Sequence, residues 1–119
     1  MMKRYADLLA DAARRVGEIQ PWDLSRQLVR DPPPLVLDVR EPQEIAIARF
    51  PGAVEIPMQE IPSRMGELDP NAEIFVLCHH GMRSAHVAGH LIQQGFTRIG
   101  NVTGGIDAWS LLVDPSVPR

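Results

Sequence analysis

Two short apolar runs, residues 35–39 and 73–77, constrain the fold of this chain most strongly. The first is apolar except for Asp38, and the second is rich in residues that favour strands. Each run has the length of a strand, and a run that is almost wholly apolar is typical of a strand buried on both faces. We therefore predict two buried strands, with the remaining elements arranged around them.

Helical segments alternate with strands along the rest of the chain. Pro21 suits the first position of a helix over residues 22–29, and residues 31–34, Asp-Pro-Pro-Pro, end it. The spacing predicts further helices over 42–46, 61–68, 85–94 and 106–112, and further strands over 53–56 and 96–102. This alternation predicts an α/β fold, in which a parallel sheet carries helices on both faces and the crossovers are right-handed.

Residues 3–19 have the apolar spacing of an amphipathic helix. The apolar positions are Tyr5, Leu8, Leu9, Ala12, Val16 and Ile19. We expect residues 1–19 to form this helix ahead of a domain over residues 20–119. The helix packs either on the core of its own domain or on a second copy, which would make a homodimer, and the sequence leaves both open.

Length and charge restrict the class of protein. A chain of 119 residues forms one domain, and its net charge of −3 favours neither nucleic acid nor an anionic membrane surface as a partner. No apolar run approaches the length of a membrane span, and the first nine residues do not have the pattern of a signal peptide. The single cysteine excludes an internal disulfide and fits a reducing compartment, so we expect a cytoplasmic protein.

That cysteine, Cys78, stands where the predicted strand 73–77 turns into the predicted helix 85–94. Unpaired N–H groups and the helix dipole at such a junction can hold an anion, and a thiol placed there ionises more readily. Gly81 permits a sharp turn, and Arg83 adds a cation that can grip an oxyanion. In parallel sheets this end of a strand is also where ligands bind. The candidate site consists of Cys78 as nucleophile and of His79, His80, Gly81, Met82, Arg83 and Ser84 as substrate-binding residues.

An inert buried thiol and a metal site are the alternatives for this loop. A lone cysteine is often a small buried apolar residue, but this one is followed by a polar loop with three potential cations. His86 and His90 lie four apart, yet Val87 stands where a metalloprotease helix needs glutamate, and one cysteine cannot build a thiolate-rich zinc site. We therefore expect a reactive thiol, no metal and no cofactor, with His86 and His90 in solvent.

Four stretches, taken in order, resemble the single-domain rhodanese family over residues 19–112. They are residues 38–42 with Glu44, residues 50–57, residues 78–84 and residues 104–109. In the second stretch, Ala48, Arg49 and Phe50 replace the Gly-His-Ile that the family usually has before the proline. The resemblance implies a three-layer α/β/α fold with five parallel strands, and a Cys78 that carries sulfur as a persulfide surrounded by the backbone amides of residues 78–83.

The resemblance also implies an activity, that of a thiosulfate sulfurtransferase. Its donor would be a small anionic sulfur compound, and its acceptor cyanide, a thiol or a protein. We interpret Asp38 and Arg40 as a buried ion pair, Gly104-Gly105 as tight backbone geometry, and Trp109 as a core residue. His79 and His80 either assist the donor or are ordinary exposed residues, and the sequence favours neither.

Three other functions compete with this one. Phosphatases and arsenate reductases also place a cysteine before an arginine, but with five residues between them, whereas this chain has four and so a smaller pocket. A non-catalytic interaction module is disfavoured because Cys78 is present. A sulfur relay with a protein partner would use the same persulfide, and with no second cysteine in the chain the acceptor thiol must come from outside.

Overall fold

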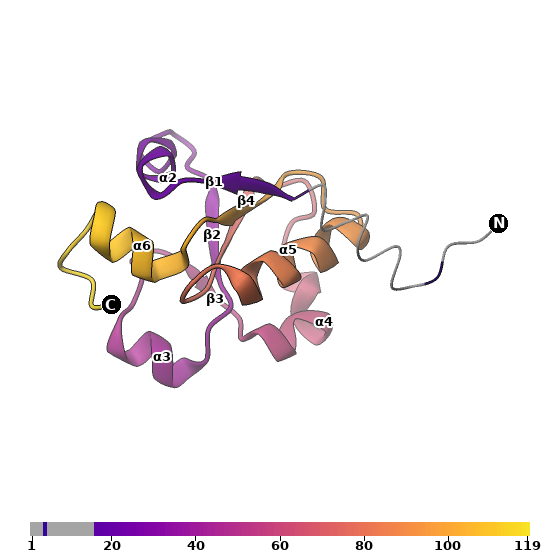
Figure 1. Ribbon diagram of the computed structural model, residues 1–119. Helices are drawn as coiled ribbons and strands as arrows, with labels where there is room; N and C mark the ends of the chain where they lie inside the picture. The colour runs from indigo at the N-terminus through magenta and orange to yellow at the C-terminus, as the bar shows by residue number, and fades with distance from the viewer. Residues whose placement is uncertain (1–3, 5–15) are drawn as a thin grey trace.

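In the computed structural model, which describes Arg4 and residues 16–119, five parallel strands form one sheet in the order β1-β5-β4-β2-β3 (Figure 1). The strands are β1 (Gly17–Ile19), β2 (Leu35–Asp38), β3 (Val54–Glu55), β4 (Ile74–Leu77) and β5 (Ile99–Val102). The predicted five-stranded parallel sheet is confirmed. β4 lies at its centre, between β2 and β5.

Helices cover both faces of the sheet, as predicted. They are α2 (Pro21–Gln27), α3 (Pro42–Ile47), α4 (Ile61–Arg64), α5 (Met82–Gln93) and α6 (Gly105–Leu112). Side chains from α4 and α5 share one buried apolar cluster, and side chains from α2 and α6, including Trp109, share another. Neighbouring residues of β2 enter different clusters, Val36 the second and Leu37 the first, which explains why this strand is apolar at successive positions.

Local sequence explains where several helices begin and end. Proline occupies the first position of α2 and of α3. A capping box, in which Glu41 and Glu44 each accept a backbone N–H of the other, also fixes the start of α3. Gly95, with φ of +99°, follows α5 and ends it as the sequence indicates.

Three predicted elements differ from the structure. Residues 17–19, expected at the end of the first helix, form β1, because they extend the sheet by pairing in parallel with β5. The sheet therefore includes residues 17–19, which the sequence analysis placed in the helix ahead of the domain. Apart from Arg4 and Val16, the other residues of that predicted helix, with its possible role in a homodimer, lie outside the described residues. The strand expected over 96–102 begins at Ile99. The helix expected over 61–68 is α4 followed by a 3-10 turn, Met65–Glu67.

The topology fixes the place of a ligand site. The chain leaves β2 toward β3 at one edge and leaves β4 toward β5 on the other side, so the strand order reverses between β2 and β4. Ligands of open parallel sheets bind beyond the carboxyl ends of the strands at such a point. Cys78 directly follows β4, and Val39 and Arg40 follow β2.

Among the described residues, no helix combines the length and the apolar character needed to cross a membrane.

Candidate functional site

The Cys78 thiol is buried at the end of β4 and faces the first turn of α5. Its side chain is 1% exposed. Sγ accepts a hydrogen bond from the Gly81 backbone N–H at 3.1 Å and lies 3.2 Å from Ser84 Oγ. Gly81 precedes α5 with φ of +100°, and the positive end of that twelve-residue helix points toward the sulfur-bearing loop. The arrangement can hold a negatively charged sulfur.

The backbone of α6 closes over the same loop. Ile106 N–H donates to the Cys78 carbonyl at 2.8 Å, and Asp107 N–H donates to the His79 carbonyl at 3.1 Å. This approach is possible because Gly105 has no Cβ and adopts φ of +62°. A Cβ at Gly105 would lie 2.4 Å from both carbonyl oxygens. The prediction of tight backbone geometry at residues 104–105 is confirmed.

Asn101, at the buried carboxyl end of β5, connects the loop to two strands. Its Nδ2 donates to the Gly81 carbonyl at 3.0 Å and to the Glu18 carboxylate at 3.1 Å, so its Oδ1 must face Ser84 Oγ, which lies 2.6 Å away. Ser84 is therefore held between Asn101 and the Cys78 sulfur. The sequence analysis assigned no role to Asn101 or Glu18, although a polar residue within a buried strand is a signal that could have been used.

Arg83, expected to hold the anionic donor, forms an ion pair across two helices. Its guanidinium donates to both carboxylate oxygens of Glu44, at 2.7 and 2.8 Å. Hydrogen bonding from Arg83 is the main cause that lowers the pKa of Glu44 to about 2, and the same bonds raise the pKa of Arg83. The Glu44 carboxylate therefore already neutralises the Arg83 charge at the end of the loop. The sequence analysis did not identify this ion pair.

The low pKa of Glu44 predicts a specific dependence of stability on pH. Because this pKa is lower in the folded state than the usual 4.5, the pair stabilises the fold above pH 4.5, and the contribution is lost as pH falls toward 2. We expect Glu44→Gln to reduce the free energy of unfolding by about 1 kcal/mol at pH 7, after allowance for solvent screening, and by clearly less at pH 3. Urea unfolding of both proteins at the two pH values measures the difference. If the two proteins differed in free energy of unfolding by the same amount at pH 7 and at pH 3, this account would be contradicted.

Asp38 and Arg40 form the buried ion pair predicted from the sequence. Their side chains are 0% and 2% exposed, and Arg40 Nη2 lies 2.6 Å from Asp38 Oδ2. The guanidinium also donates through Nε to Asp38 Oδ1 at 3.0 Å and through Nη2 to the Ala48 carbonyl at 2.7 Å. The pair therefore connects the end of β2 to residues 48–50, the segment in which this chain differs from the usual pattern of the family it resembles.

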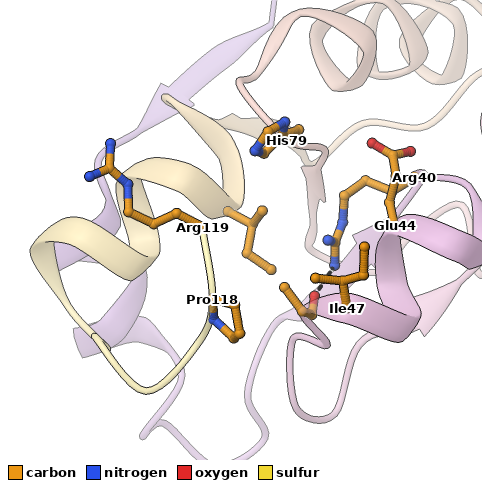
Figure 2. Close-up of a pocket in the computed structure, with 8 residues that line it drawn as sticks. Arg40, Glu44, Ile47, His79, Pro118 and Arg119 are labelled. Atoms are coloured by element: carbon orange, nitrogen blue, oxygen red, sulfur yellow. Dashed lines mark hydrogen bonds between the residues drawn. The ribbon is translucent and has the colours of Figure 1, made fainter.

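A shallow hollow of about 120 Å³ lies beside the reactive loop (Figure 2). Arg40, Glu44 and Ile47 form one wall, Pro118 and Arg119 face them, and His79 lies at its edge. Cys78 itself does not line the hollow. The volume is well below the 300 Å³ or more that is typical of sites for drug-sized ligands, so the hollow suits a small compound.

The remaining predicted residues are placed as follows. His80 is exposed on the loop. Met82, which the sequence analysis placed in the loop, is the first residue of α5 and has 82% of its surface in solvent. His86 is exposed on α5, as predicted. The prediction for His90 is wrong, because this side chain is half-buried and its Nε2 is buried with no hydrogen-bond partner among the described residues. The helix pattern of the sequence does not reveal that His90 turns toward the domain.

Comparisons with known proteins agree with this fold. The model of the rhodanese-like domain matches residues 22–112. A sulfurtransferase of Allochromatium vinosum is 39% identical over 95 residues, which are 80% of this chain and 89% of that protein. The crystal structure of SSP1007 from Staphylococcus saprophyticus has a TM-score of 0.76 and 32% identity, covering 87% of this chain and all of that one. The chain therefore belongs to the rhodanese-like domain family.

Another relative is much longer. The chloroplastic rhodanese-like/PpiC domain-containing protein 12 of Arabidopsis thaliana is 47% identical over 87 residues, which are 70% of this chain and 29% of that protein. The rhodanese-like domain thus occurs both in short chains and as one part of larger proteins.

Proposed function

We propose that this protein is a sulfurtransferase that moves sulfane sulfur from thiosulfate, or a related anionic donor, to cyanide or a thiol through a persulfide on Cys78. The observation that carries the proposal is the surroundings of Cys78 Sγ, with the Gly81 N–H and the Ser84 hydroxyl at hydrogen-bond distance and the first turn of α5 beside it. Family membership and a relative named as a sulfurtransferase support sulfur transfer in general.

The proposed reaction has two half-reactions. The Cys78 thiolate attacks the outer sulfur of thiosulfate, a new S–S bond forms, and the bond to the sulfonate group breaks with its electron pair leaving on sulfite. The persulfide anion is stabilised by the Gly81 N–H, a donor already in place before the reaction. The Ser84 hydroxyl would add a second hydrogen bond once its one proton turns from Asn101 Oδ1 to the sulfur. The acceptor then attacks the outer persulfide sulfur, and the Cys78 thiolate is regenerated. A cytoplasmic setting, which we also propose, would keep this thiol reduced.

Arg83 has a different part in this proposal from the one the sequence suggests. Because Glu44 accepts one hydrogen bond from each outer nitrogen, Arg83 would mainly orient the loop and add positive potential. Its other N–H groups would be left for direct contact with a donor. The loop amides are then the first contacts of the incoming anion. His79, at the edge of the hollow, remains a candidate for a second contact.

A persulfide relay to a protein is the second candidate. Exposed apolar side chains on both sides of the loop, Met82 on α5 and Ile47 on α3, favour it, because a protein acceptor would cover them. A phosphatase is less well supported, since four residues between Cys78 and Arg83 leave little room for a tetrahedral phosphate.

Steady-state kinetics test the proposed reaction order. With thiosulfate and cyanide as substrates, a covalent intermediate predicts parallel double-reciprocal lines, because sulfite leaves before the acceptor reacts. Intersecting lines would mean that both substrates bind together and would contradict the persulfide mechanism. A protein that forms the persulfide but turns over slowly with cyanide and small thiols would favour the relay.

A further inference from the structure

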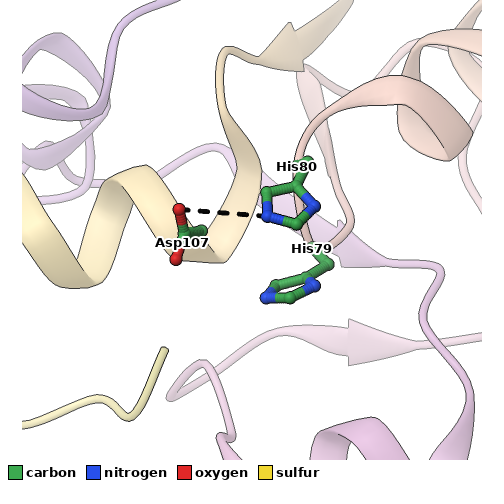
Figure 3. A group of neighbouring side chains, drawn as sticks. All are labelled: His79, His80 and Asp107. Atoms are coloured by element: carbon green, nitrogen blue, oxygen red, sulfur yellow. Dashed lines mark ion pairs between the residues drawn. The ribbon is translucent and has the colours of Figure 1, made fainter.

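His79, His80 and Asp107 form a cluster of potential metal ligands beside the reactive loop (Figure 3). Of the three, the proposed reaction involves only His79, as a possible contact of the donor. The two histidines follow Cys78 on the loop, and Asp107 comes from the first turn of α6. One ligand atom from each residue can be chosen so that all three lie within 4.8 Å of one another. From these residues we propose that the protein binds one divalent transition-metal ion, such as Zn²⁺, beside the reactive loop.

One distance in the cluster is already close to what a metal site needs, and the others, all within 4.8 Å, would shorten by at most about 1.4 Å. Zinc bonds of 2.0–2.2 Å in a tetrahedral arrangement place neighbouring ligand atoms about 3.4 Å apart. His80 Nε2 lies 3.9 Å from Asp107 Oδ2, so the two need to approach by only about 0.5 Å. The His79 and His80 rings lie side by side, with centroids 4.0 Å apart. His80 is 64% exposed, which leaves its ring free to adjust.

A backbone hydrogen bond holds the loop that carries the two histidines close to the helix that carries Asp107. Asp107 N–H donates to the His79 carbonyl at 3.1 Å, so the loop and the first turn of α6 are held together at this point. Two imidazoles and one carboxylate are a donor set that suits zinc and leaves a fourth position for water. The sequence does not reveal this set, because Asp107 follows the histidines by 27 residues and is brought to them only by the close approach at Gly105.

Arg119 opposes metal binding and so provides a sharp test. Its Nε donates to Asp107 Oδ1 at 2.9 Å, and its Nη2 lies 3.4 Å from Oδ2, the oxygen that faces His80. Arg119 also lowers the pKa of Asp107, which keeps that carboxylate charged. Removing Arg119 should therefore strengthen metal binding, since it removes a positive charge and frees a ligand, while removing His80 should weaken it.

Calorimetric titration with zinc chloride at pH 7.5 tests the proposal, with Cys78→Ser as the parent so that the thiol cannot bind the metal. We expect one zinc per chain, an affinity at least about tenfold weaker in the parent with His80→Ala, and a stronger affinity with Arg119→Ala. His86→Ala, an exposed histidine on α5, is the matched control and should leave the affinity unchanged. Because every protein in the series lacks Cys78, the outcome is independent of the proposed sulfur transfer.

Two outcomes would overturn the proposal. One is the absence of zinc binding by the folded parent at millimolar zinc. The other is an equal effect of His80→Ala and His86→Ala, which would place the ion elsewhere. Circular dichroism of each variant verifies that the fold is retained.

Discussion

Replacing Gly105 with alanine should lower the free energy of unfolding by about 3 kcal/mol and remove most sulfur transfer. Alanine at φ of +62° carries the cost of the left-handed region, and its Cβ would lie 2.4 Å from the carbonyl oxygens of Cys78 and His79. Both oxygens belong to backbone, so α6 and the reactive loop must separate. Urea unfolding measures the loss of stability, and turnover with thiosulfate measures the loss of activity.

Gly95→Ala is the matched control for this prediction. Gly95 has φ of +99°, and nothing lies within 4 Å of a Cβ built there. This variant should carry only the conformational cost of about 1–2 kcal/mol and keep its activity. If the variants at Gly105 and Gly95 were equal in stability and in turnover, the close contact at Gly105 would not be what positions the loop.

Replacing Asp38 with asparagine should destabilise the protein by roughly 3–5 kcal/mol. Asparagine has the shape of aspartate but leaves the Arg40 charge, which is 2% exposed, without a counter-charge. Adding Arg40→Met to Asp38→Asn should recover part of the loss, because the uncompensated charge is then removed. Urea unfolding of the single and double variants gives both values.

The exposed ion pair of Arg49 and Glu55 is the control for the prediction on the buried Asp38–Arg40 pair. Its closest atoms are 3.3 Å apart, but the Arg49 side chain is 65% exposed, so Glu55→Gln should cost less than about 1 kcal/mol. A similar cost for Asp38→Asn and Glu55→Gln would show that burial of the Asp38–Arg40 pair does not matter. A double variant no more stable than Asp38→Asn would contradict the role given to the Arg40 charge.

The sequence predicted the sheet and the position of the reactive loop because these depend on local patterns. The apolar runs before Asp38 and Cys78 are strands by length and composition, and the order of elements then places Cys78 at a carboxyl end of the sheet. The Asp38–Arg40 pair was also predictable, because a charge that interrupts a buried strand requires a partner close by.

The contacts between distant segments could not be predicted in this way. Helical spacing over residues 3–19 concealed that residues 17–19 pair with β5, because a three-residue edge strand has almost no pattern of its own. Arg83 was expected to be free for the donor, and its pairing with Glu44 depends on how α3 and α5 are packed. The hydrogen bonds that join Asn101 to Ser84 and Gly81 likewise depend on the meeting of β5 with the loop.

The most direct test of the central claim is the intact mass of the purified protein after incubation with thiosulfate, beside a Cys78→Ser variant. We predict that the wild-type protein gains the mass of one sulfur atom, that cyanide removes it, and that the variant gains nothing. No adduct with thiosulfate or any other sulfane donor, or an equal adduct on the variant, would contradict sulfur transfer through Cys78.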